Sequence, residues 1–379
     1  MSTMFTNLRI PKTKNQKIAI VHDFLTYFGG AEKVLLSLHK LYPDAPIYTL
    51  LYNKTKMKQY FPEAKIRVSF LNKLPTFLKK RKKYLLPLMP TATETFDLRD
   101  FDIVISSSSS FVKGVITKPK TVHINYCHTP TRFLWDWYYN YLKENKISKI
   151  KKIFLIPLLH YLRMWDKSAS ERVDYFIANS KHTAKRIEKF YGRKSVVIYP
   201  PTKLKVCKVE SGTVYHYFLI VSRLSPYKKI DLAIEAFNKL ELPLIVIGEG
   251  SDKKRLEKMA DKNIKFLGFQ PRGKINQYYK NCYAFIFPGE DDFGITPIEA
   301  MSFGKPILAY RKGGVLETVI EGETGEFFDD PIPEILTDGV RRLKNNYSNY
   351  NPEKIKKQAA KFSEEIFKEK IKKFVKGIV

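Results

Sequence analysis

Residues 18–32 read IAIVHDFLTYFGGAE, and this stretch holds the pattern on which the fold interpretation rests. The apolar run 18–21 predicts a buried parallel strand. The paired glycines Gly29 and Gly30 then form a loop that opens a helix. Glycine lets a phosphate approach the backbone and a helix start offers N–H donors, although the same pair also suits a plain tight turn. The stretch therefore predicts one strand–loop–helix unit with a phosphate loop or a turn at its centre.

The same alternation of strand and helix fills both halves of the chain. Further strands are expected at residues 103–105, 122–124, 175–178, 218–221, 244–247, 284–287 and 306–309, with helices at 231–240 and 252–260. This alternation predicts an α/β fold of two doubly wound, Rossmann-like domains that face each other across a cleft. We expect an N-terminal domain at 1–205, a C-terminal domain at 206–354, and a helix at about 355–379 that packs on the outside and can return to the first domain.

The composition excludes several classes of protein. The chain has 379 residues, of which 44% are hydrophobic and 14% aromatic, and this excludes an intrinsically disordered chain. Cys127, Cys207 and Cys282 are too far apart for a metal or redox motif, so a disulfide scaffold is excluded and a reducing compartment is expected. No apolar run approaches the ~20 residues that span a bilayer, and the N-terminal region lacks the apolar core of a signal peptide. We therefore expect a soluble or peripheral intracellular protein.

Positive charge is concentrated in the first half. The net charge is +29; residues 1–200 hold 36 Lys and Arg against 14 Asp and Glu, whereas residues 201–379 hold 31 against 24. The densest basic cluster comprises Lys79, Lys80, Arg81, Lys82 and Lys83. This cluster and a second basic stretch, residues 143–152, each lead into an apolar run. Such stretches suit an anionic membrane surface, at roughly 1 kcal/mol per cation, or a solvated basic face. No nucleic-acid motif accompanies them, so no nucleic-acid partner is expected.

Two basic residues follow the first expected strand of the second half. Arg223 and Lys228 stand five positions apart on the loop after residues 218–221. Cations at the carboxyl end of a strand can converge on a diphosphate and neutralise both the bound ligand and a departing nucleoside diphosphate. A solvated basic loop is the alternative for these two residues in isolation.

The most specific segment is FPGEDDFGITPIEA at residues 287–300. It predicts a strand, a Pro-Gly turn, an acidic loop, and a helix that contains Glu299. Gly294 lets a ligand lie against the backbone, the helix start presents N–H groups, and the carboxylates can bind sugar hydroxyls. Acidic residues at a helix start are also ordinary capping residues, which is the simpler interpretation for Asp291 or Asp292 alone.

In their order along the chain, these segments resemble the retaining glycosyltransferases of family 4, which have the two-domain GT-B fold. The resemblance begins at about residue 17 and covers nearly the whole chain. It rests on the glycine loop, Arg223 with Lys228, residues 248–250, the segment around Glu299, and Gly313-Gly314 with Glu317. Within the family the chain is most similar to the O-antigen-type mannosyltransferases, through residues 22–32, 42–48 and 128–136.

The resemblance implies a role for each matching residue. Arg223 and Lys228 would hold the donor diphosphate, and Glu299 would bind the ribose hydroxyls. His128 would lie beside the donor sugar near the reacting carbon, and the nucleobase would lie near the turn at Gly268. Backbone contacts with the donor would come from Gly29, Gly30, Phe293, Gly294 and Ile295.

One position departs from the family pattern. The family pairs two glutamates eight positions apart, but the residue eight before Glu299 is Asp291. Aspartate is one methylene shorter, so either Asp291 reaches the donor sugar through a shift of the loop or Glu290 takes its place. The catalytic candidates are His128, Asp291, Arg223 and Lys228.

No metal or cofactor is required by this interpretation. Asp100-Phe101-Asp102 has the look of a metal site, but it directly precedes the strand at 103–105 and is expected to cap the start of that strand. His22, His123 and His128 do not stand at zinc spacings.

The expected reaction is a sugar transfer with retention. The acceptor hydroxyl would attack the anomeric carbon from the face that the diphosphate leaves, and the leaving phosphate would take the proton. The resemblance implies a nucleotide-sugar donor, with GDP-mannose favoured, and an acceptor held by the first domain. A lipid-linked glycan would explain the basic first half, so we assign Arg132 and the cluster at 79–83 to the acceptor or an anionic membrane.

The expected location is therefore cytoplasmic, peripheral on the inner face of the cell membrane. Two alternatives remain open. The first is a retaining transferase that uses a UDP-sugar or a soluble sugar acceptor. The second is a non-catalytic, basic binding protein of the same fold, which only the replacement at Asp291 supports.

Overall fold

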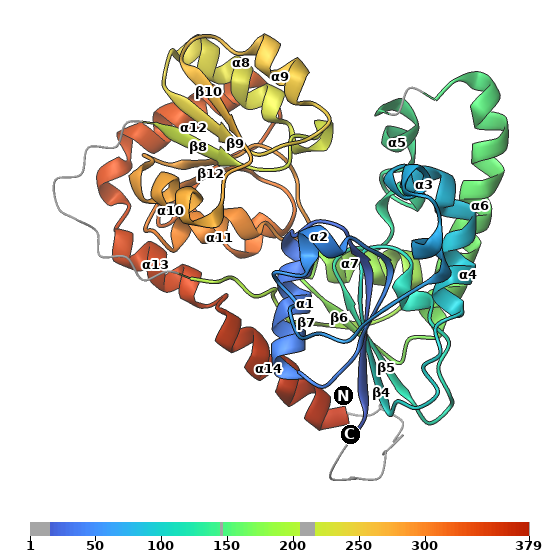
Figure 1. Ribbon diagram of the computed structural model, residues 1–379. Coiled ribbons are helices and arrows are strands. Elements are labelled where there is room, and N and C mark those ends of the chain that lie inside the picture. The colour runs from blue at the N-terminus through green and yellow to red at the C-terminus, as the bar shows by residue number, and fades with distance from the viewer. Residues whose placement is uncertain (1–15, 145–146, 205–216, 379) are drawn as a thin grey trace. The chain divides into compact units, whose positions relative to one another are not determined.

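The computed structural model describes residues 16–144, 147–204 and 217–378. It divides into two compact units, which Figure 1 shows as ribbons: a first unit of residues 1–201 with 365–379, and a second unit of residues 202–364. The predicted boundary between residues 205 and 206 lies outside the described residues, as does Cys207.

Seven parallel strands form the sheet of the first unit, in the order β3-β2-β1-β4-β5-β6-β7. The strands are β1 (Ile18–Leu25), β2 (Ile47–Tyr52), β3 (Ile66–Val68), β4 (Ile103–Ser108), β5 (Val122–Cys127), β6 (Tyr175–Ala178) and β7 (Ser195–Val197). The apolar runs predicted as strands are confirmed as β1, β4, β5 and β6. β2, β3 and β7 are not among the predicted strands. β3 and β7 have only three residues each and neither is buried, whereas β2 is a buried strand that the prediction lacks.

Helices cover both faces of this sheet (Figure 1). They are α1 (Gly30–Leu41), α2 (Lys54–Met57), α3 (Thr76–Lys80), α4 (Met89–Glu94), α5 (Tyr138–Glu144), α6 (Lys149–Glu171), α7 (Lys181–Tyr191) and α14 (Glu364–Ile378). The basic cluster at residues 79–83 lies at the end of α3 and in the 3₁₀ turns that follow, at Lys82–Leu88.

The two faces of the sheet carry separate hydrophobic cores. Val21 belongs to the core shared with α4 and α6, and Ile20 belongs to the core shared with α1 and α14. Successive side chains of a strand point to opposite faces. His22 therefore lies on the α1 face, Asp23 lies on the α6 face, and Ser107, which pairs with His22 in the register of β1 and β4, joins the α1 face.

The second unit repeats the arrangement with six parallel strands in the order β10-β9-β8-β11-β12-β13. The strands are β8 (Phe218–Val221), β9 (Leu244–Ile247), β10 (Ile264–Gly268), β11 (Phe285–Phe287), β12 (Ile307–Tyr310) and β13 (Gly325–Phe328). The helices are α8 (Ile230–Leu240), α9 (Lys253–Met259), α10 (Arg272–Asn281), α11 (Ile295–Met301), α12 (Pro333–Asn345) and α13 (Pro352–Ala360). The four strands and two helices predicted for this half are confirmed as β8, β9, β11, β12, α8 and α9.

Both sheets place their first strand beside their fourth. This is the doubly wound order, in which the chain turns in opposite directions from the first strand and leaves a crevice at the carboxyl ends of the two neighbours. The crevice lies between β1 and β4 in the first unit and between β8 and β11 in the second. The predicted α/β fold of two Rossmann-like domains is confirmed, and each unit has its own switch point for ligands.

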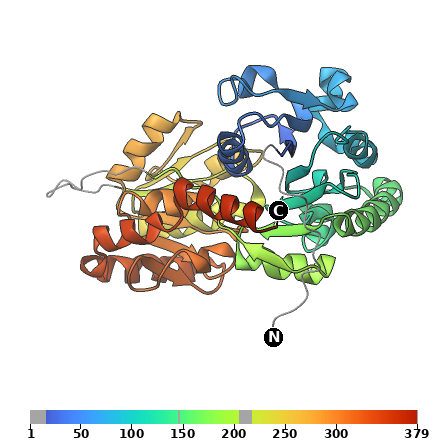
Figure 2. The same cartoon turned by 90° about the horizontal axis from the view of Figure 1, so that it is seen from below.

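The last two helices belong to different units. Asn351 caps α13, whose Gln358 donates to the Thr318 carbonyl at 3.0 Å within the second unit. Helix α14 instead completes a core of the first unit with Phe367, Ile371 and Val375; its end carries the C mark in Figures 1 and 2. The returning segment is predicted to begin at about residue 355, whereas the division in the structure lies between residues 364 and 365.

Within the described part of the chain, no helix is both long and apolar enough to cross a bilayer. Cys127 and Cys282 are both buried.

Candidate functional site

Asp23 organises the crevice of the first unit. Its carboxylate accepts four backbone N–H bonds, of 2.6–3.0 Å, from Ser109, Ser110, Phe111 and Val112. These four residues follow β4, and Asp23 is 4% exposed. The carboxylate therefore fixes the chain where it leaves β4, which keeps the neighbouring Ser107 in place.

Three side chains connect β1, β4 and β5 on the α1 face. His22 Nδ1 lies 3.1 Å from Ser107 Oγ, and Ser107 Oγ lies 2.8 Å from His128 Nε2. His128 directly follows β5, and its backbone N–H donates to the Ser108 carbonyl at 2.8 Å. Burial, with a smaller contribution from the charge of His22, lowers the pKa of His128 to about 3. His128 is therefore a neutral imidazole at physiological pH.

The glycine loop joins this group through Glu32 of α1. Glu32 Oε2 accepts the Gly29 N–H at 2.8 Å, and Glu32 Oε1 lies 3.5 Å from His22 Nε2. Gly30 is the first residue of α1. A Cβ at Gly29 would lie 3.0 Å from the Tyr27 ring and 3.2 Å from Glu32 Oε2, so the position has little room for a larger residue. The predicted loop is thus fastened to the histidine group, and sequence reasoning missed Ser107 and Glu32 as its members.

The side chains of the basic cluster at residues 79–83 have different surroundings. Lys82 donates to Thr26 Oγ1 at 2.9 Å and lies 4.2 Å from the centre of the Phe24 ring, at the carboxyl end of β1. Lys79 donates to the Asn72 carbonyl at 3.0 Å. Arg81 and Lys83 are exposed, and the side chain of Lys80 lies outside the described residues. Lys82 thus lies at the carboxyl end of β1, beside the crevice.

Arg132 lies in the loop after His128, and its side chain contacts residues of the same loop. It forms an ion pair with Asp136 at 3.5 Å and lies 4.8 Å from the Trp137 ring centre. Arg186 of α7 binds the other carboxylate oxygen of Asp136 at 2.5 Å. The structure therefore ties Arg132 to its own loop, with 21% of its side chain exposed.

In the second unit, Lys228 and Asp291 meet at the crevice between β8 and β11. Lys228 Nζ lies 2.5 Å from Asp291 Oδ1 and also bonds the second carboxylate oxygen. Burial by itself lowers the pKa of Lys228, but the charge of Asp291 and the hydrogen bond to it outweigh burial, so the pKa is raised. Arg223 is close enough for its charge to act on Lys228. The structure thus brings together three of the four catalytic candidates.

Glycines let the loops of the second unit approach closely. A Cβ at Gly289 would lie 2.7 Å from the Lys228 carbonyl oxygen. Gly313 has φ +81°, and a Cβ there would lie 2.3 Å from the Asp291 carbonyl oxygen. Any larger residue at either position would displace the backbone that carries Lys228 or Asp291.

Glu299 stands on α11 with two partners from α10. Its Oε1 accepts from Arg272 at 3.2 Å, and its Oε2 accepts from the Tyr279 hydroxyl at 3.3 Å. Burial, and then the charge of Glu299, raise the pKa of Tyr279 well above its usual value. Sequence reasoning missed Arg272 and Tyr279, because nothing in α10 itself marks them; only the packing against α11 does.

The remaining donor-binding candidates lie along the same edge of the second sheet. Gly294 precedes α11, Ile295 begins it, and the buried Phe293 ring packs on Phe362 at 5.7 Å between centres. Gly268 ends β10, and its carbonyl accepts the Gly248 N–H at 2.9 Å.

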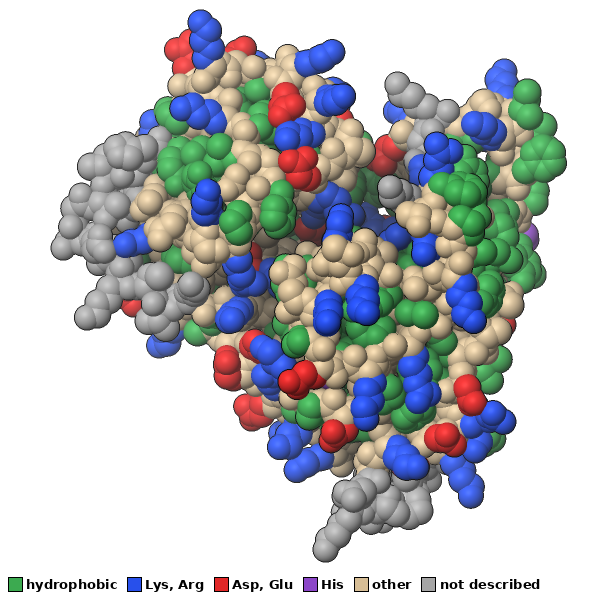
Figure 3. Space-filling view, in the orientation of Figure 1, with side chains coloured by type: hydrophobic (Ala, Val, Ile, Leu, Met, Phe, Trp, Pro, Cys, Tyr) green, Lys and Arg blue, Asp and Glu red, His purple; other side chains and the backbone are tan. Residues whose placement is uncertain are grey.

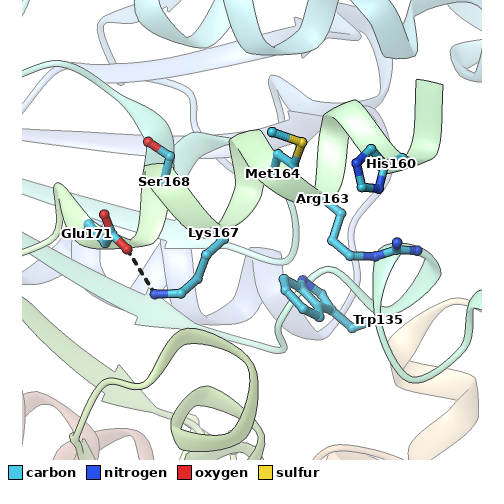
Figure 4. Close-up of a pocket in the computed structure, with 7 residues that line it drawn as sticks. All are labelled: Trp135, His160, Arg163, Met164, Lys167, Ser168 and Glu171. Atoms are coloured by element: carbon cyan, nitrogen blue, oxygen red, sulfur yellow. Dashed lines mark hydrogen bonds and ion pairs between the residues drawn. The ribbon is translucent and has the colours of Figure 1, made fainter. Parts of the chain in front are cut away.

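No group of three or more potential metal ligands occurs among the described residues. A pocket of about 410 Å³ lies along α6, lined by Trp135, His160, Arg163, Met164, Lys167, Ser168 and Glu171. Figure 4 shows the lining side chains, of which Lys167 and Glu171 form an ion pair of 3.0 Å. The pocket contains none of the predicted site residues.

Two family descriptions match the chain. "Glycosyltransferase Family 4" matches residues 28–205, and "Glycosyl transferases group 1" matches residues 208–362.

The similar curated proteins include an uncharacterised glycosyltransferase and several mannosyltransferases. An uncharacterised glycosyltransferase of Methanocaldococcus jannaschii is 27% identical over 189 residues, which are 48% of this chain and 53% of that protein. The alpha-1,3/1,6-mannosyltransferase ALG2 of Candida glabrata is 25% identical over 81% of this chain and 78% of its own length. The Saccharomyces cerevisiae protein of the same name is 23% identical over 82% and 72%. The chain therefore spans about half of the first relative and about three quarters of the others.

Solved structures of similar fold cover almost the whole chain. A sucrose-phosphate synthase from Thermosynechococcus elongatus superposes with a TM-score of 0.75 at 16% identity, over 96% of this chain and 99% of its own. Anabaena HepE, in complex with UDP and glucose, gives 0.69 at 20% identity, over 96% and 100%. At these identities the likeness shows a shared fold.

Proposed function

The chain belongs to glycosyltransferase family 4, and we propose on that basis that it transfers mannose from GDP-mannose to a lipid-linked glycan, with retention, on the cytoplasmic face of the cell membrane. Its fold is the GT-B fold that the sequence predicts. The observation that carries the mannosyl assignment is the alignment with mannosyltransferases over about four fifths of the chain. The lipid acceptor and the membrane are supported by charge and by exposed apolar side chains of the first unit.

The second unit supplies the cations for the donor diphosphate. Lys228 is held in place by Asp291, and Arg223 lies near it. A diphosphate oxygen would share or replace the carboxylate as the anion on Lys228, and Arg223 would add a second charge-assisted bond. Glu299, which Arg272 and Tyr279 hold, would accept hydrogen bonds from ribose hydroxyls.

The proposed reaction needs no protein nucleophile. The acceptor oxygen forms a bond to the anomeric carbon while the bond from that carbon to the diphosphate oxygen breaks on the same face. The proton of the acceptor hydroxyl passes to the departing phosphate, so the products are the glycoside and GDP. Arg223 and Lys228 would stabilise the charge that grows on the leaving group, where preorganised cations are most effective.

One face of α6 supports attachment to a membrane surface. Ile150, Ile153, Phe154, Tyr161 and Met164 stand at helical spacing and are 56–77% exposed. Lysines flank the start of the stripe at Lys149, Lys151 and Lys152. Figure 3 shows hydrophobic side chains gathered along this side of the first unit, with Lys and Arg among them. Apolar side chains beside cations suit the headgroup region of an anionic leaflet.

A thermal-shift titration with GDP, UDP, ADP, GDP-mannose and UDP-glucose tests the donor. A ligand at a hundredfold excess over Kd stabilises the folded state by ~2.7 kcal/mol. We expect a shift with GDP and GDP-mannose that Arg223→Ala abolishes and that the control Arg341→Ala, at an exposed position of α12, preserves. A shift with UDP alone would keep the transferase and overturn the mannosyl assignment in favour of a UDP-sugar.

Flotation with anionic liposomes tests the membrane assignment. We expect the wild-type protein to float and the double variant Ile153→Asp/Phe154→Asp to remain at the bottom. The matched control is Ile332→Asp, an apolar position of the second unit that is 47% exposed. Absence of wild-type binding at low salt, together with turnover of a soluble acceptor, would favour the soluble alternative.

A further inference from the structure

Four side chains of the first unit form a continuous polar chain that ends at a solvent-accessible nitrogen. From Glu32 Oε1 to His22 Nε2 the distance is 3.5 Å, and the next two links, His22–Ser107 and Ser107–His128, are 3.1 and 2.8 Å. Glu32, His22 and Ser107 are at most 4% exposed. His128 Nδ1 has no hydrogen-bond partner among the described residues, and it is not one of the fully buried polar atoms that lack a partner.

The chemistry of these groups gives the chain a direction. A carboxylate only accepts hydrogen bonds, and it repels the lone pair of an imidazole nitrogen, so a neutral His22 carries its proton on Nε2 beside Glu32. His22 Nδ1 is then an acceptor, and the Ser107 hydroxyl donates to it. Because the hydroxyl has one proton, its oxygen accepts from His128, which must carry its own proton on Nε2.

We propose that Glu32, His22 and Ser107 are positioning residues that hold His128 with its proton on Nε2, so that Nδ1 is presented as a hydrogen-bond acceptor to a hydroxyl of the sugar being transferred. The contact with the sugar rests on the proposed function; the proton position does not. A histidine without such partners would interconvert between its two tautomers, and only one of them could accept the hydroxyl proton.

A second Ser–His pair on the same strands provides the comparison. Ser106 Oγ lies 2.7 Å from His123 Nε2 on the opposite face of the sheet. There the ring is 0% exposed, and its other nitrogen is buried without a partner. The Ser106–His123 pair has the same chemistry as Ser107–His128, but it leads to no accessible atom. Ser106→Ala therefore tests the structural cost of removing such a bond.

The test reads the proton position directly in the full-length, unliganded protein. Two-bond ¹H–¹⁵N correlations on histidine-labelled protein show which ring nitrogen carries the proton, and His128→Gln identifies the signals of His128. We expect Nε2–H in the wild type. Glu32→Gln still has an oxygen for the Gly29 N–H but turns an amide donor toward His22, so it should reverse the chain and move the proton of His128 to Nδ1. Ser107→Ala should give a mixture, and Ser106→Ala should leave His128 unchanged.

The enzymatic readout separates this role from a structural one. Glu32→Gln and Ser107→Ala should lose about tenfold in kcat/KM for GDP-mannose, the size of one neutral hydrogen bond, while their thermal shift with GDP, which has no sugar, stays that of the wild type. Ser106→Ala should retain wild-type turnover. Nδ1–H in the wild type, or an unchanged tautomer in Glu32→Gln, would overturn the proposal. A wild-type protein with the expected tautomer and no turnover of GDP-mannose would instead count against the proposed donor.

Discussion

Lys228 and Asp291 show how a single contact prepares a binding residue. The side chains are 15% and 22% exposed, so the ammonium group is largely removed from water and needs an anion beside it. Asp291 supplies that anion in the structure. A bound diphosphate can supply it in the complex, and the two anions then compete for one cation.

Asp291→Asn tests this competition. Removal of one partner of a largely buried ion pair leaves a charge uncompensated, so we expect the unliganded protein to lose about 2 kcal/mol of stability. The added stability from GDP should be larger than in the wild type, because the diphosphate no longer displaces a carboxylate. Thermal unfolding with and without GDP measures both effects. The control is Glu334→Gln, which breaks the exposed ion pair with Lys239 and should change stability much less than Asp291→Asn does.

The buried His123 should make the free energy of unfolding depend on pH in the acid range. Burial lowers the pKa of His123 to about 4, from about 6.5 for a histidine in water. Between these two pH values the unfolded chain binds a proton that the folded protein does not, so the free energy of unfolding falls as the pH falls. The contribution from this one side chain between pH 7 and pH 5 is about 2 kcal/mol. His123→Gln should reduce the slope of stability against pH in this range, as measured by thermal unfolding; a slope equal to that of the wild type would contradict the prediction.

The residue types of the candidate site could be predicted from the sequence, but their partners could not. Arg223, Lys228 and Glu299 stand in loops and helix starts that the local pattern marks. Lys228 and Asp291 are 63 positions apart, and His22 and Ser107 are 85 apart. Only the strand order brings such residues together, so no local spacing reveals the bonds.

Helix α6 joins two environments along its length. The exposed apolar stripe runs along one face from Ile150 to Met164, whereas the buried side chain of Asp166 fixes the helix to the loops after β4 and β5. Asp166 forms an ion pair with Lys113, and it also accepts hydrogen bonds from Thr131, Trp135 and Tyr191. The side chains of Asp166 and Lys113 are 1% and 2% exposed. The loop that begins with His128 is thereby tied to α6.

Asp166→Asn should destabilise the protein strongly. The change leaves the ammonium group of Lys113 buried without a countercharge, which costs about 3–5 kcal/mol. The matched control is Asp338→Asn, whose pair with Arg342 lies on the surface of α12 and should matter by about 0.5 kcal/mol or less. Urea unfolding of the full-length variants gives both values. Equal effects of the two changes would show that the buried pair does not support the fold.

Elements with a continuous apolar run could be predicted from the sequence, because a strand buried on both faces needs apolar side chains at every position. β8, β11 and β12 are of this kind. β10 and β13 were missed because Lys265 and Glu326 interrupt their apolar pattern. The glutamate is buried all the same: Arg342 lies 3.0 Å from it, and the Tyr350 hydroxyl also bonds it.

Over the whole molecule, charge is distributed unequally between the two halves of the chain. The first half has 36 basic against 14 acidic residues, and the second has 31 against 24.

The alternation of strands and helices was enough to predict two α/β units. It could not place the division after residue 364, because α13 and α14 have similar amphipathic, Lys-rich sequences and differ only in the core that each one meets.

Attachment to anionic vesicles should weaken as salt is added. The screening length falls from about 30 Å at 0.01 M salt to about 3 Å at 1 M, so the contribution of the lysines decreases while that of the apolar stripe remains. We expect the fraction of protein that floats to decrease progressively as ionic strength rises. The double variant Lys151→Gln/Lys152→Gln should show a smaller dependence on salt. Neutral vesicles serve as the control. Binding that does not respond to salt would mean that the basic residues play no part.

Helix α14 has a consequence for the order in which the two units fold during synthesis: the first unit cannot be completed until the last helix has been made. Phe367, Ile371 and Val375 are 1–6% exposed and fill a core whose other members were synthesised before residue 202. The second unit needs only the contiguous residues 202–364, so it can finish folding while the first still waits for its last helix. Until that helix emerges, the nascent first unit leaves exposed to water the apolar side chains that α14 covers in the folded protein.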